Sequence, residues 1–312
     1  MSRSTKTRAT NITVVLAAIF LCSSPSVGGA HGNTHTLTCG PEKTIGHAIK
    51  MLKPGDTLLV SGLCNENVDI GEEVDGIILD GQGTAAVHGD SGGFTFTVTG
   101  RGITIRGFTI TGGLQGIAVL DGGSAVIDSN TIQDTAMNGI TVFRNSTAHI
   151  INNTIQNNPS SGIQLQAASS ARIGFTGPPN NRVSAPNTIQ NNGGPGIQVL
   201  RASAAQIFTN TIQNNGSHGV VVDRNAQAEI GACNITGNLG DGIRGMRNAG
   251  VDIGTDASGA TPQFDDDTNT GINGGFGVRC MIDGFVDGRL GALTGALGGK
   301  SFGESCTDSV IP

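Results

Sequence analysis

The chain of 312 residues contains no Tyr and no Trp, and aromatic residues make up only 4% of it. Tyr and Trp build most of the protein surfaces on which sugar rings and nucleobases stack, so their absence weakens every interpretation as a glycan-processing enzyme. Proline is scarce, and the 50 glycines follow no Gly-X-Y period, which excludes collagen. Because branched aliphatic residues are frequent, the chain can bury a core and is not a disordered tract.

The sequence also lacks an apolar run long enough to span a bilayer, which takes about 20 residues. Residues 12–22 (ITVVLAAIFLC) form an apolar run of 11 that follows three cationic residues. Small residues ending at Ala30 come next, so residues 1–30 have the pattern of a signal peptide that is removed on export. We therefore expect a secreted or periplasmic protein without a membrane span.

Positive charge is scarce too. The chain has 18 Lys and Arg against 24 Asp and Glu, a formal charge of −6. Removal of residues 1–30 takes away three cations and no anion, which changes the charge to −9. An acidic protein of this kind is not a general partner of nucleic acid or of anionic membranes. We expect no cofactor, and the oligomeric state stays open.

No C-x-x-C motif occurs, so zinc binding and thioredoxin-like chemistry are poor interpretations of the cysteines. Five cysteines remain after residue 30, and in an oxidising compartment pairing is the default. Cys39 and Cys64 lie near the start, and Cys280 and Cys306 lie near the end. We expect one disulfide at each end, which leaves Cys233 without an evident partner.

What the sequence has in abundance is repetition. The tetrapeptide NTIQ occurs four times and a variant, CNIT, once, at intervals of 23, 34, 23 and 23 residues: Asn130, Asn153, Asn187, Asn210 and Cys233. A second block, GI-V followed by A-I, keeps step with the first. Its apolar residues alternate with period two, which predicts strands, and the Gly, Asn and Ser between them suit tight turns. Each unit thus holds three short strands.

Three strands per unit, repeated in register, predict one coil of a parallel solenoid with coils about 4.8 Å apart. Equivalent side chains then form columns, and one column is expected in the core: Ile127, Ile150, Ile173, Ile207, Ile230 and Ile253. The first asparagine of each NTIQ motif is expected at a corner, where stacked amides satisfy backbone groups: Asn130, Asn153, Asn187 and Asn210. The hexamer NTIQNN is therefore architectural, not catalytic.

The pattern NTIQNN…GI-V…A-I resembles the repeat of the pectin-lyase-like superfamily, clearly over residues 107–253 and more loosely over residues 65–306. The resemblance implies an all-β fold, a single-stranded right-handed parallel β-helix. It specifies activity far less, because the superfamily includes pectate lyases, polygalacturonases, alginate epimerases and lyases, and phage tailspikes.

The ends of the chain fit the same fold. Residues 31–64 are expected to form an N-terminal strand and a helix that caps the first coil, as solenoid ends require. Residues 65–312 are expected to form the β-helix and a C-terminal cap, with loop insertions near residues 174–186 and 254–270.

In enzymes of this superfamily the reactive groups lie on the outer face of one sheet, which corresponds here to the GI-V strand. His218 and Asp241 occupy equivalent loop positions in consecutive coils, and Asp223 and Arg244 follow on the strand and its edge. A histidine beside carboxylates can act as a general base while an arginine holds an acidic sugar. We favour the alternative that His218 is a turn residue, because other coils carry ordinary turn residues there: Asn138, Ser161 and Pro195.

Two other charged groups are candidates for binding. Arg201, Arg224 and Arg247 are expected one coil apart at the corner after the GI-V strand, where they suit a carboxylated or sulfated polysaccharide. We favour a solvated corner at which arginine pairs with aspartate. Asp265 and Asp267 carry oxygen ligands of the kind Ca²⁺ prefers, but the EF-hand spacing is missing, so we expect no metal.

The chain lacks the RIK motif of polygalacturonases, and it lacks the DPHD motif and tyrosine of alginate epimerases. These observations favour an exported β-helix that acts as a non-catalytic scaffold or as a surface or glycan-interaction module. The alternative is a polysaccharide lyase, hydrolase or epimerase that acts on an acidic glycan beside the GI-V strand. In either case polysaccharide is the expected partner.

Overall fold

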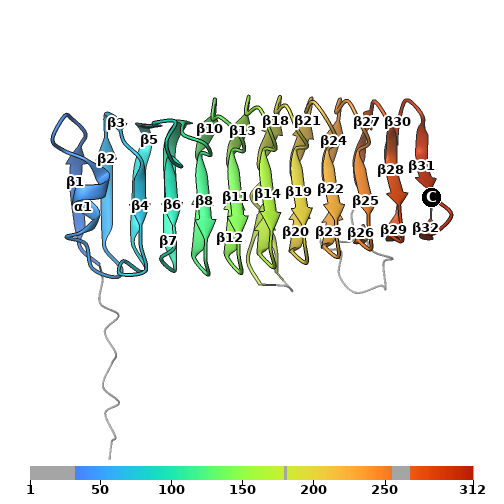
Figure 1. The fold of residues 1–312 in the computed structure, drawn as a ribbon, viewed down its shortest axis with the longest axis horizontal. Coiled ribbons are helices and arrows are strands. Elements are labelled where there is room, and N and C mark those ends of the chain that lie inside the picture. The colour runs from blue at the N-terminus through green and yellow to red at the C-terminus, as the bar shows by residue number, and fades with distance from the viewer. Residues whose placement is uncertain (1–31, 179–180, 255–267, 312) are drawn as a thin grey trace, which may run out of the picture. The chain divides into compact units, whose positions relative to one another are not determined.

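The computed structural model describes residues 32–178, 181–254 and 268–311. Over these residues the backbone winds into a parallel β-helix in which a complete coil contributes three short strands (Figure 1). The predicted signal peptide and the acidic loop with Asp265 and Asp267 lie outside the described residues. Within those residues, no helix is long and apolar enough to cross a lipid bilayer.

Sheet 1 consists of the GI-V strands and their equivalents, ten strands in parallel register. Its strands, in chain order, are β4 (Val68–Ile70), β6 (Phe96–Val98), β8 (Ile117–Leu120), β11 (Ile140–Phe143), β14 (Ile163–Gln166), β19 (Ile197–Leu200), β22 (Val220–Asp223), β25 (Ile243–Met246), β28 (Phe276–Met281) and β31 (Gly298–Phe302).

Sheet 2 contains the A-I strands and sheet 3 the TIQ strands. The strands of sheet 2 are β1 (Thr34–Thr38), β2 (Thr57–Ser61), β9 (Ser124–Asp128), β12 (Thr147–Ile151), β15 (Ser170–Ile173), β20 (Ala204–Phe208), β23 (Gln227–Gly231), β26 (Gly250–Ile253), β29 (Phe285–Arg289) and β32 (Thr307–Ile311). The strands of sheet 3 are β3 (Leu63–Asn65), β10 (Thr131–Gln133), β13 (Thr154–Gln156), β18 (Thr188–Gln190), β21 (Thr211–Gln213), β24 (Asn234–Thr236), β27 (Thr270–Asn273) and β30 (Ala292–Gly295). Two long strands, β5 (Ile78–Gly89) and β7 (Ile103–Gly112), run through both sheets.

The core is built from columns of aliphatic side chains. In sheet 2 the six predicted isoleucines are register partners in parallel strands, and each is fully buried: Ile127, Ile150, Ile173, Ile207, Ile230 and Ile253. Burial of one such side chain stabilises the fold by about 1.5–3 kcal/mol. The predicted solenoid is therefore confirmed.

The first asparagine of each NTIQ motif lies in the interior at the corner between sheets 2 and 3. The backbone N–H of Asn130 donates to Oδ1 of Asn153 over 2.9 Å, and the same bond links Asn153 to Asn187 and Asn187 to Asn210. Cys233 takes the next place in this ladder: it is buried, and its N–H donates to Oδ1 of Asn269. Burial raises the pKa of the Cys233 thiol to about 12. The unpaired cysteine thus stands where other coils have an amide.

A second ladder uses the sixth residue of the hexamer. Asn158 donates its N–H to Oδ1 of Asn192, and the pattern continues through Asn215, Asn238 and Asn273. These amides satisfy the corner between sheets 3 and 1, just as the first ladder satisfies the corner between sheets 2 and 3. The first and the sixth asparagine positions of NTIQNN are therefore structural.

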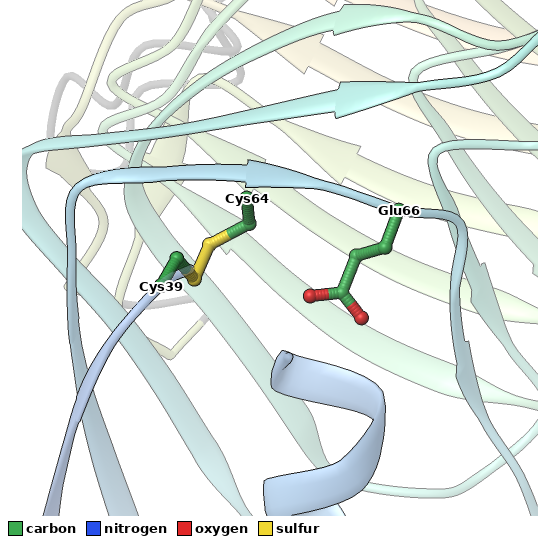
Figure 2. Close-up of side chains that lie close together, drawn as sticks. All are labelled: Cys39, Cys64 and Glu66. Carbon is green, nitrogen blue, oxygen red and sulfur yellow. A yellow bond between two sulfur atoms is a disulfide. The ribbon is translucent and has the colours of Figure 1, made fainter. Parts of the chain in front are cut away.

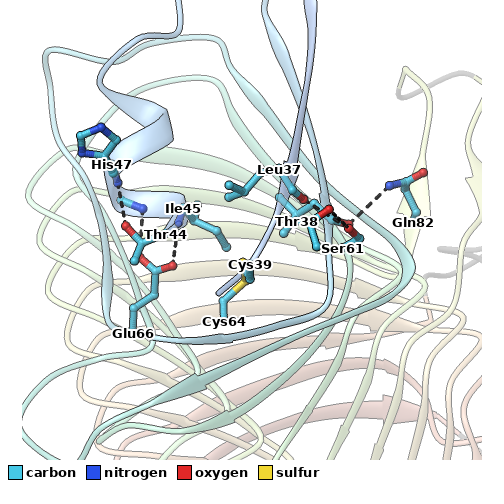
Figure 3. Close-up of a disulfide and its surroundings, with 12 residues drawn as sticks. Leu37, Thr38, Cys39, Thr44, Ile45, His47, Ser61, Cys64, Glu66 and Gln82 are labelled. Carbon is cyan, nitrogen blue, oxygen red and sulfur yellow. Dashed lines mark hydrogen bonds between the residues drawn. A yellow bond between two sulfur atoms is a disulfide. The ribbon is translucent and has the colours of Figure 1, made fainter. Parts of the chain in front are cut away.

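The N-terminal end is closed by helix α1 (Ile45–Ile49), which is buried through Ile45, Ala48 and Ile49. Glu66, just after β3, accepts the N–H groups of Ile45 (2.6 Å) and Gly46 (2.9 Å) with its two carboxylate oxygens (Figure 3). A carboxylate at a helix N-terminus pairs with donors that have no partner inside the helix. The disulfide between Cys39 and Cys64 ties the preceding chain to the same coil.

The other end carries the second predicted disulfide, Cys280–Cys306, which links β28 to the last coil. The first insertion leaves sheet 2 after Ile173 and forms an antiparallel hairpin of β16 (Phe175–Thr176) and β17 (Val183–Ser184). The ring of Phe175 packs edge-on against Phe208, with 5.2 Å between ring centroids. The second insertion leaves from the corresponding point after Ile253, and most of it lies outside the described residues.

Candidate functional site

The outer face of sheet 1 changes character along the coils. One outward-facing register position is occupied, in successive coils, by Thr141, Gln164, Gln198, Val221, Arg244 and Arg279. The same position therefore carries a hydroxyl, two amides and an aliphatic side chain before β25 and β28 place guanidinium groups there, and the last strand, β31, carries Ser301. Any chemistry on this face is concentrated in the C-terminal coils.

His218, Asp241 and Arg244 lie close together at the N-terminal ends of strands β22 and β25 of sheet 1. His218 Nδ1 lies 3.7 Å from Asp241 Oδ2. Arg244 Nε donates to that oxygen over 2.7 Å, and Arg244 Nη2 forms an ion pair with it at 2.7 Å. The carboxylate of Asp241 is buried, whereas the His218 side chain is 14% exposed. Three of the four side chains that the sequence analysis grouped are therefore neighbours in the structure.

Their hydrogen bonds show that they also support the backbone. His218 Nδ1 accepts the N–H of Asp241 over 2.7 Å, and Asp241 Oδ1 accepts the N–H of Phe276 over 2.9 Å. Three coils earlier, Asn138 Oδ1 accepts the N–H of Ser161 in the same way. The histidine and the aspartate therefore perform the role that an asparagine performs elsewhere in this column of turns.

The environment of His218 determines its protonation. Burial and the nearby Arg244 and Arg279 guanidinium groups lower its pKa to about 4, and Asp241 opposes this only in part. The ring is thus neutral at neutral pH. Because Nδ1 accepts a backbone N–H, the proton lies on Nε2, which makes no hydrogen bond within the described part of the chain. His218 therefore presents a donor to the outside and not a base.

Asp223 does not join this cluster. It is buried at the opposite end of its strand, where both of its oxygens accept from Arg247 over 2.7 Å, while Arg224 Nε lies 3.9 Å away. Arg201, in the same corner file, has no carboxylate partner among the described residues. All three corner arginines have positive φ, between 51° and 57°, so each occupies a left-handed conformation that costs about 1 kcal/mol.

In the part of the chain that the structure describes, one group of side chains has the spacing of metal ligands: Cys39, Cys64 and Glu66 (Figure 2). Its two sulfur atoms form a disulfide, and the Glu66 carboxylate accepts two helix N–H groups. None of the three is available to a cation, so the group is a structural clamp.

A groove on the outer face of sheet 2 has a volume of about 930 Å³ and extends from β7 to β29. Its lining includes His149, Arg172, Glu229, Asp287 and Phe285. The catalytic and ligand-binding residues predicted from the sequence lie on the GI-V strand and its flanks, so this groove was not among the predictions. The available signal was that both insertions follow an A-I strand, after Ile173 and after Ile253, and that these strands belong to sheet 2.

Comparison with known proteins supports the fold. Residues 66–184 match the family described as "Right handed beta helix region". Among solved structures, pectate lyase Pel9A aligns with a TM-score of 0.55 at 12% identity, over 89% of this chain and 80% of the other. The enzymatically active domain of tailspike protein 2 of bacteriophage CBA120 aligns with a TM-score of 0.56 at 11% identity, over 90% of this chain and 47% of the other. No curated protein sequence matches the chain. At such identities the similarity extends to the fold alone.

Proposed function

We propose that this chain, which is a pectin-lyase-like right-handed parallel β-helix, is an exported, non-catalytic module that binds an acidic polysaccharide on sheet 1. The observation that carries the proposal is the pattern of used and unused groups at the C-terminal end of that sheet. His218 Nδ1 and Asp241 Oδ1 each accept a backbone N–H group, and Asp241 Oδ2 accepts from Arg244. The Arg279 guanidinium and the Nε2–H of His218 have no hydrogen-bond acceptor within the described residues.

The donors suit a carboxylate or sulfate. Arg279 stands one coil beyond Arg244 at the same outward position, and its guanidinium lies near the Phe276 ring, 5.7 Å from the centroid. It has no carboxylate partner within the described residues, and neither does Arg201. With the Nε2–H of His218, these groups offer charge-assisted hydrogen bonds to an anionic sugar.

Export is part of the proposal and has separate support. The two disulfides are of the kind that persists in an oxidising compartment. Residues 1–30 have the charge and hydrophobicity pattern of a signal peptide. Mass spectrometry of the protein from the culture medium or periplasm tests this: cleavage after Ala30 supports export, and an intact N-terminus in the cytosol contradicts it.

Binding is tested with oligomers of galacturonate and of alginate, measured by isothermal titration calorimetry at low and high salt. Arg279→Ala and Arg201→Ala should each weaken binding by about threefold to tenfold, and added salt should weaken binding of the parent protein. The matched control is Arg101→Ala, an exposed arginine several coils away, which should bind like the parent. Equal loss in all three variants would reduce the effect to net charge, and no binding by the parent protein would refute the proposal.

A second candidate is the polysaccharide lyase or epimerase. One observation favours it: His218 stays neutral down to about pH 4 and lies beside Arg244 and Arg279. A base would require the other tautomer, with the proton on Nδ1 and loss of the Asp241 N–H bond. Incubation with the same oligomers tests for an enzyme. Ultraviolet absorbance detects unsaturated uronates made by a lyase, and NMR detects uronates whose configuration an epimerase has changed. Product that disappears in His218→Ala establishes the enzyme.

A further inference from the structure

The groove on sheet 2 is separate from the acidic-polysaccharide site proposed on sheet 1. The β-strands that form it run across the groove, so a molecule lying along it passes one coil about every 4.8 Å. Its floor has small side chains at equivalent positions, among them Ser124, Thr147, Ser170 and Ala204. Such a floor suits a linear polymer whose units recur regularly and lie flat.

The floor is the face of a sheet and not its edge. Backbone groups of β9 through β29 pair with the strands on either side, so they offer no free row of N–H and C=O groups. A peptide that binds by adding a strand needs such a row. Recognition in this groove must therefore come from hydroxyl, amide, carboxylate and aromatic side chains.

The histidine and the arginine at the N-terminal end of the groove are already engaged in hydrogen bonds. His149 Nε2 donates to the carbonyl of Phe175 over 2.5 Å, and Arg172 donates to the carbonyl of Gly177 over 2.5 Å while stacking on the Phe175 ring. Both therefore anchor the first insertion. No other basic residue lines this end of the groove in the part of the chain that the structure describes, so it does not suit an anionic ligand.

The C-terminal end is acidic. Glu229, Asp252 and Asp287 occupy one register position in three successive coils, and all three line the groove. Gln206, one coil earlier, donates to Glu229 over 2.8 Å. Carboxylates in such a file repel a polyanion and attract a cationic or hydroxyl-rich ligand.

An aromatic platform lies beside these carboxylates. Phe285 is 43% exposed, and it is the only phenylalanine among the exposed large hydrophobic side chains of the described residues. Its register neighbour in the preceding coil is Gly250, which has no side chain to cover the ring. The apolar face of a sugar ring can stack on such an open aromatic ring, and Asp287 lies two residues away on the same side of the strand.

We propose that this groove binds a linear amino-sugar polysaccharide, with sugar rings on the small-residue floor and on Phe285, and protonated amines paired with Glu229 and Asp287. The ligand is thus opposite in charge to the one proposed for sheet 1. The two sites belong to different sheets, so each can fail without the other.

Calorimetry with the full chain tests the proposal, at a pH where sugar amines are protonated. The probes are a β-1,4-linked glucosamine oligosaccharide, its fully N-acetylated counterpart, and an oligolysine. We expect the glucosamine oligomer to bind at least about tenfold more tightly than either of the others. Equal binding of the acetylated oligomer would overturn the charge argument, and tighter binding of oligolysine would show a basic-peptide site instead.

Variants locate the site. Glu229→Gln combined with Asp287→Asn should weaken binding at least about tenfold, and Phe285→Leu, which keeps an apolar side chain but removes the ring, about threefold or more. The matched control, Glu42→Gln with Asp69→Asn, removes two exposed carboxylates far along the chain and should leave binding unchanged. Melting temperatures verify that each variant is folded. An equal loss in the control, or no loss in the groove variants, would refute the site.

Discussion

Substitution of His218 distinguishes a structural turn residue from a catalytic one. His218→Ala leaves the buried N–H of Asp241 without its acceptor, which should cost about 1–3 kcal/mol in the free energy of unfolding. His218→Asn places an amide oxygen where Asn138 already accepts the equivalent N–H over 3.0 Å. The asparagine variant should therefore retain nearly all of the parent's stability at neutral pH.

The pH dependence gives a second measure. The pKa of His218 falls from 6.5 to about 4 on folding, so the unfolded chain takes up the proton first as pH decreases. The stabilisation is present in full above about pH 6.5 and is lost as pH falls toward 4. After allowance for partial exposure of the ring, it amounts to about 2 kcal/mol. His218→Asn should lose this component.

The assay is urea denaturation at about pH 7 and about pH 4.5 for the parent, His218→Asn and His218→Ala. The difference in unfolding free energy between the two pH values should be about 2 kcal/mol smaller in both variants than in the parent. An unchanged pH dependence in His218→Asn would refute the assignment of the shifted pKa to this ring. If His218→Asn lost as much stability at neutral pH as His218→Ala, the role of His218 Nδ1 as acceptor of the Asp241 N–H would be refuted.

Four further predictions concern the asparagine ladders, the buried Cys233 and the N-terminal disulfide. Asn187→Ala removes a buried amide that accepts from Asn153 and donates to Asn210, and should cost about 2–4 kcal/mol by denaturation. Gln190→Ala, in the outer glutamine file of sheet 3, should cost less than about 1 kcal/mol. Cys233→Asn should raise the denaturation midpoint, since it supplies the missing amide. The Cys233 thiol, buried and with a pKa of about 12, should resist thiol reagents until the protein unfolds, and rapid labelling of the native protein would contradict the structure. Removal of the Cys39–Cys64 disulfide, which joins residues 25 apart, should cost about 3.5 kcal/mol, and a melting temperature equal to the parent's would refute its role as a clamp.

The fold could be predicted because the residue pattern that specifies it repeats along the chain. A 23-residue interval repeated with isoleucines at fixed positions can be satisfied by stacking equivalent side chains, and the observed register pairs Ile127 with Ile150 and Ile173. The second asparagine ladder escaped prediction although the sixth residue of NTIQNN recurs as regularly as the first. Its position follows from where the chain turns between sheets 3 and 1, and the spacing of apolar residues does not give that corner.

For the candidate site, the sequence predicted which residues lie close together but not how they are hydrogen-bonded. Equivalent positions in successive coils must lie close together, so His218 had to be near Asp241. The repeat does not specify which side-chain atom accepts which backbone N–H, and that hydrogen bond determines the tautomer of His218. Asp223 shows the same limit: its side chain turns away from His218 because two hydrogen bonds from Arg247 hold it at the far end of the strand.

The amide ladders have a direction. Each backbone N–H in the ladder of Asn130, Asn153 and Asn187 donates to the side chain of the following coil, and none donates backward. A ladder built in this way has no preferred length, since an added coil receives one bond and passes one on. Duplication or deletion of a 23-residue unit would therefore preserve the interior, and it would lengthen or shorten any polymer-binding track on the outside by one step. The reach of such a protein can change in evolution without any redesign of its core.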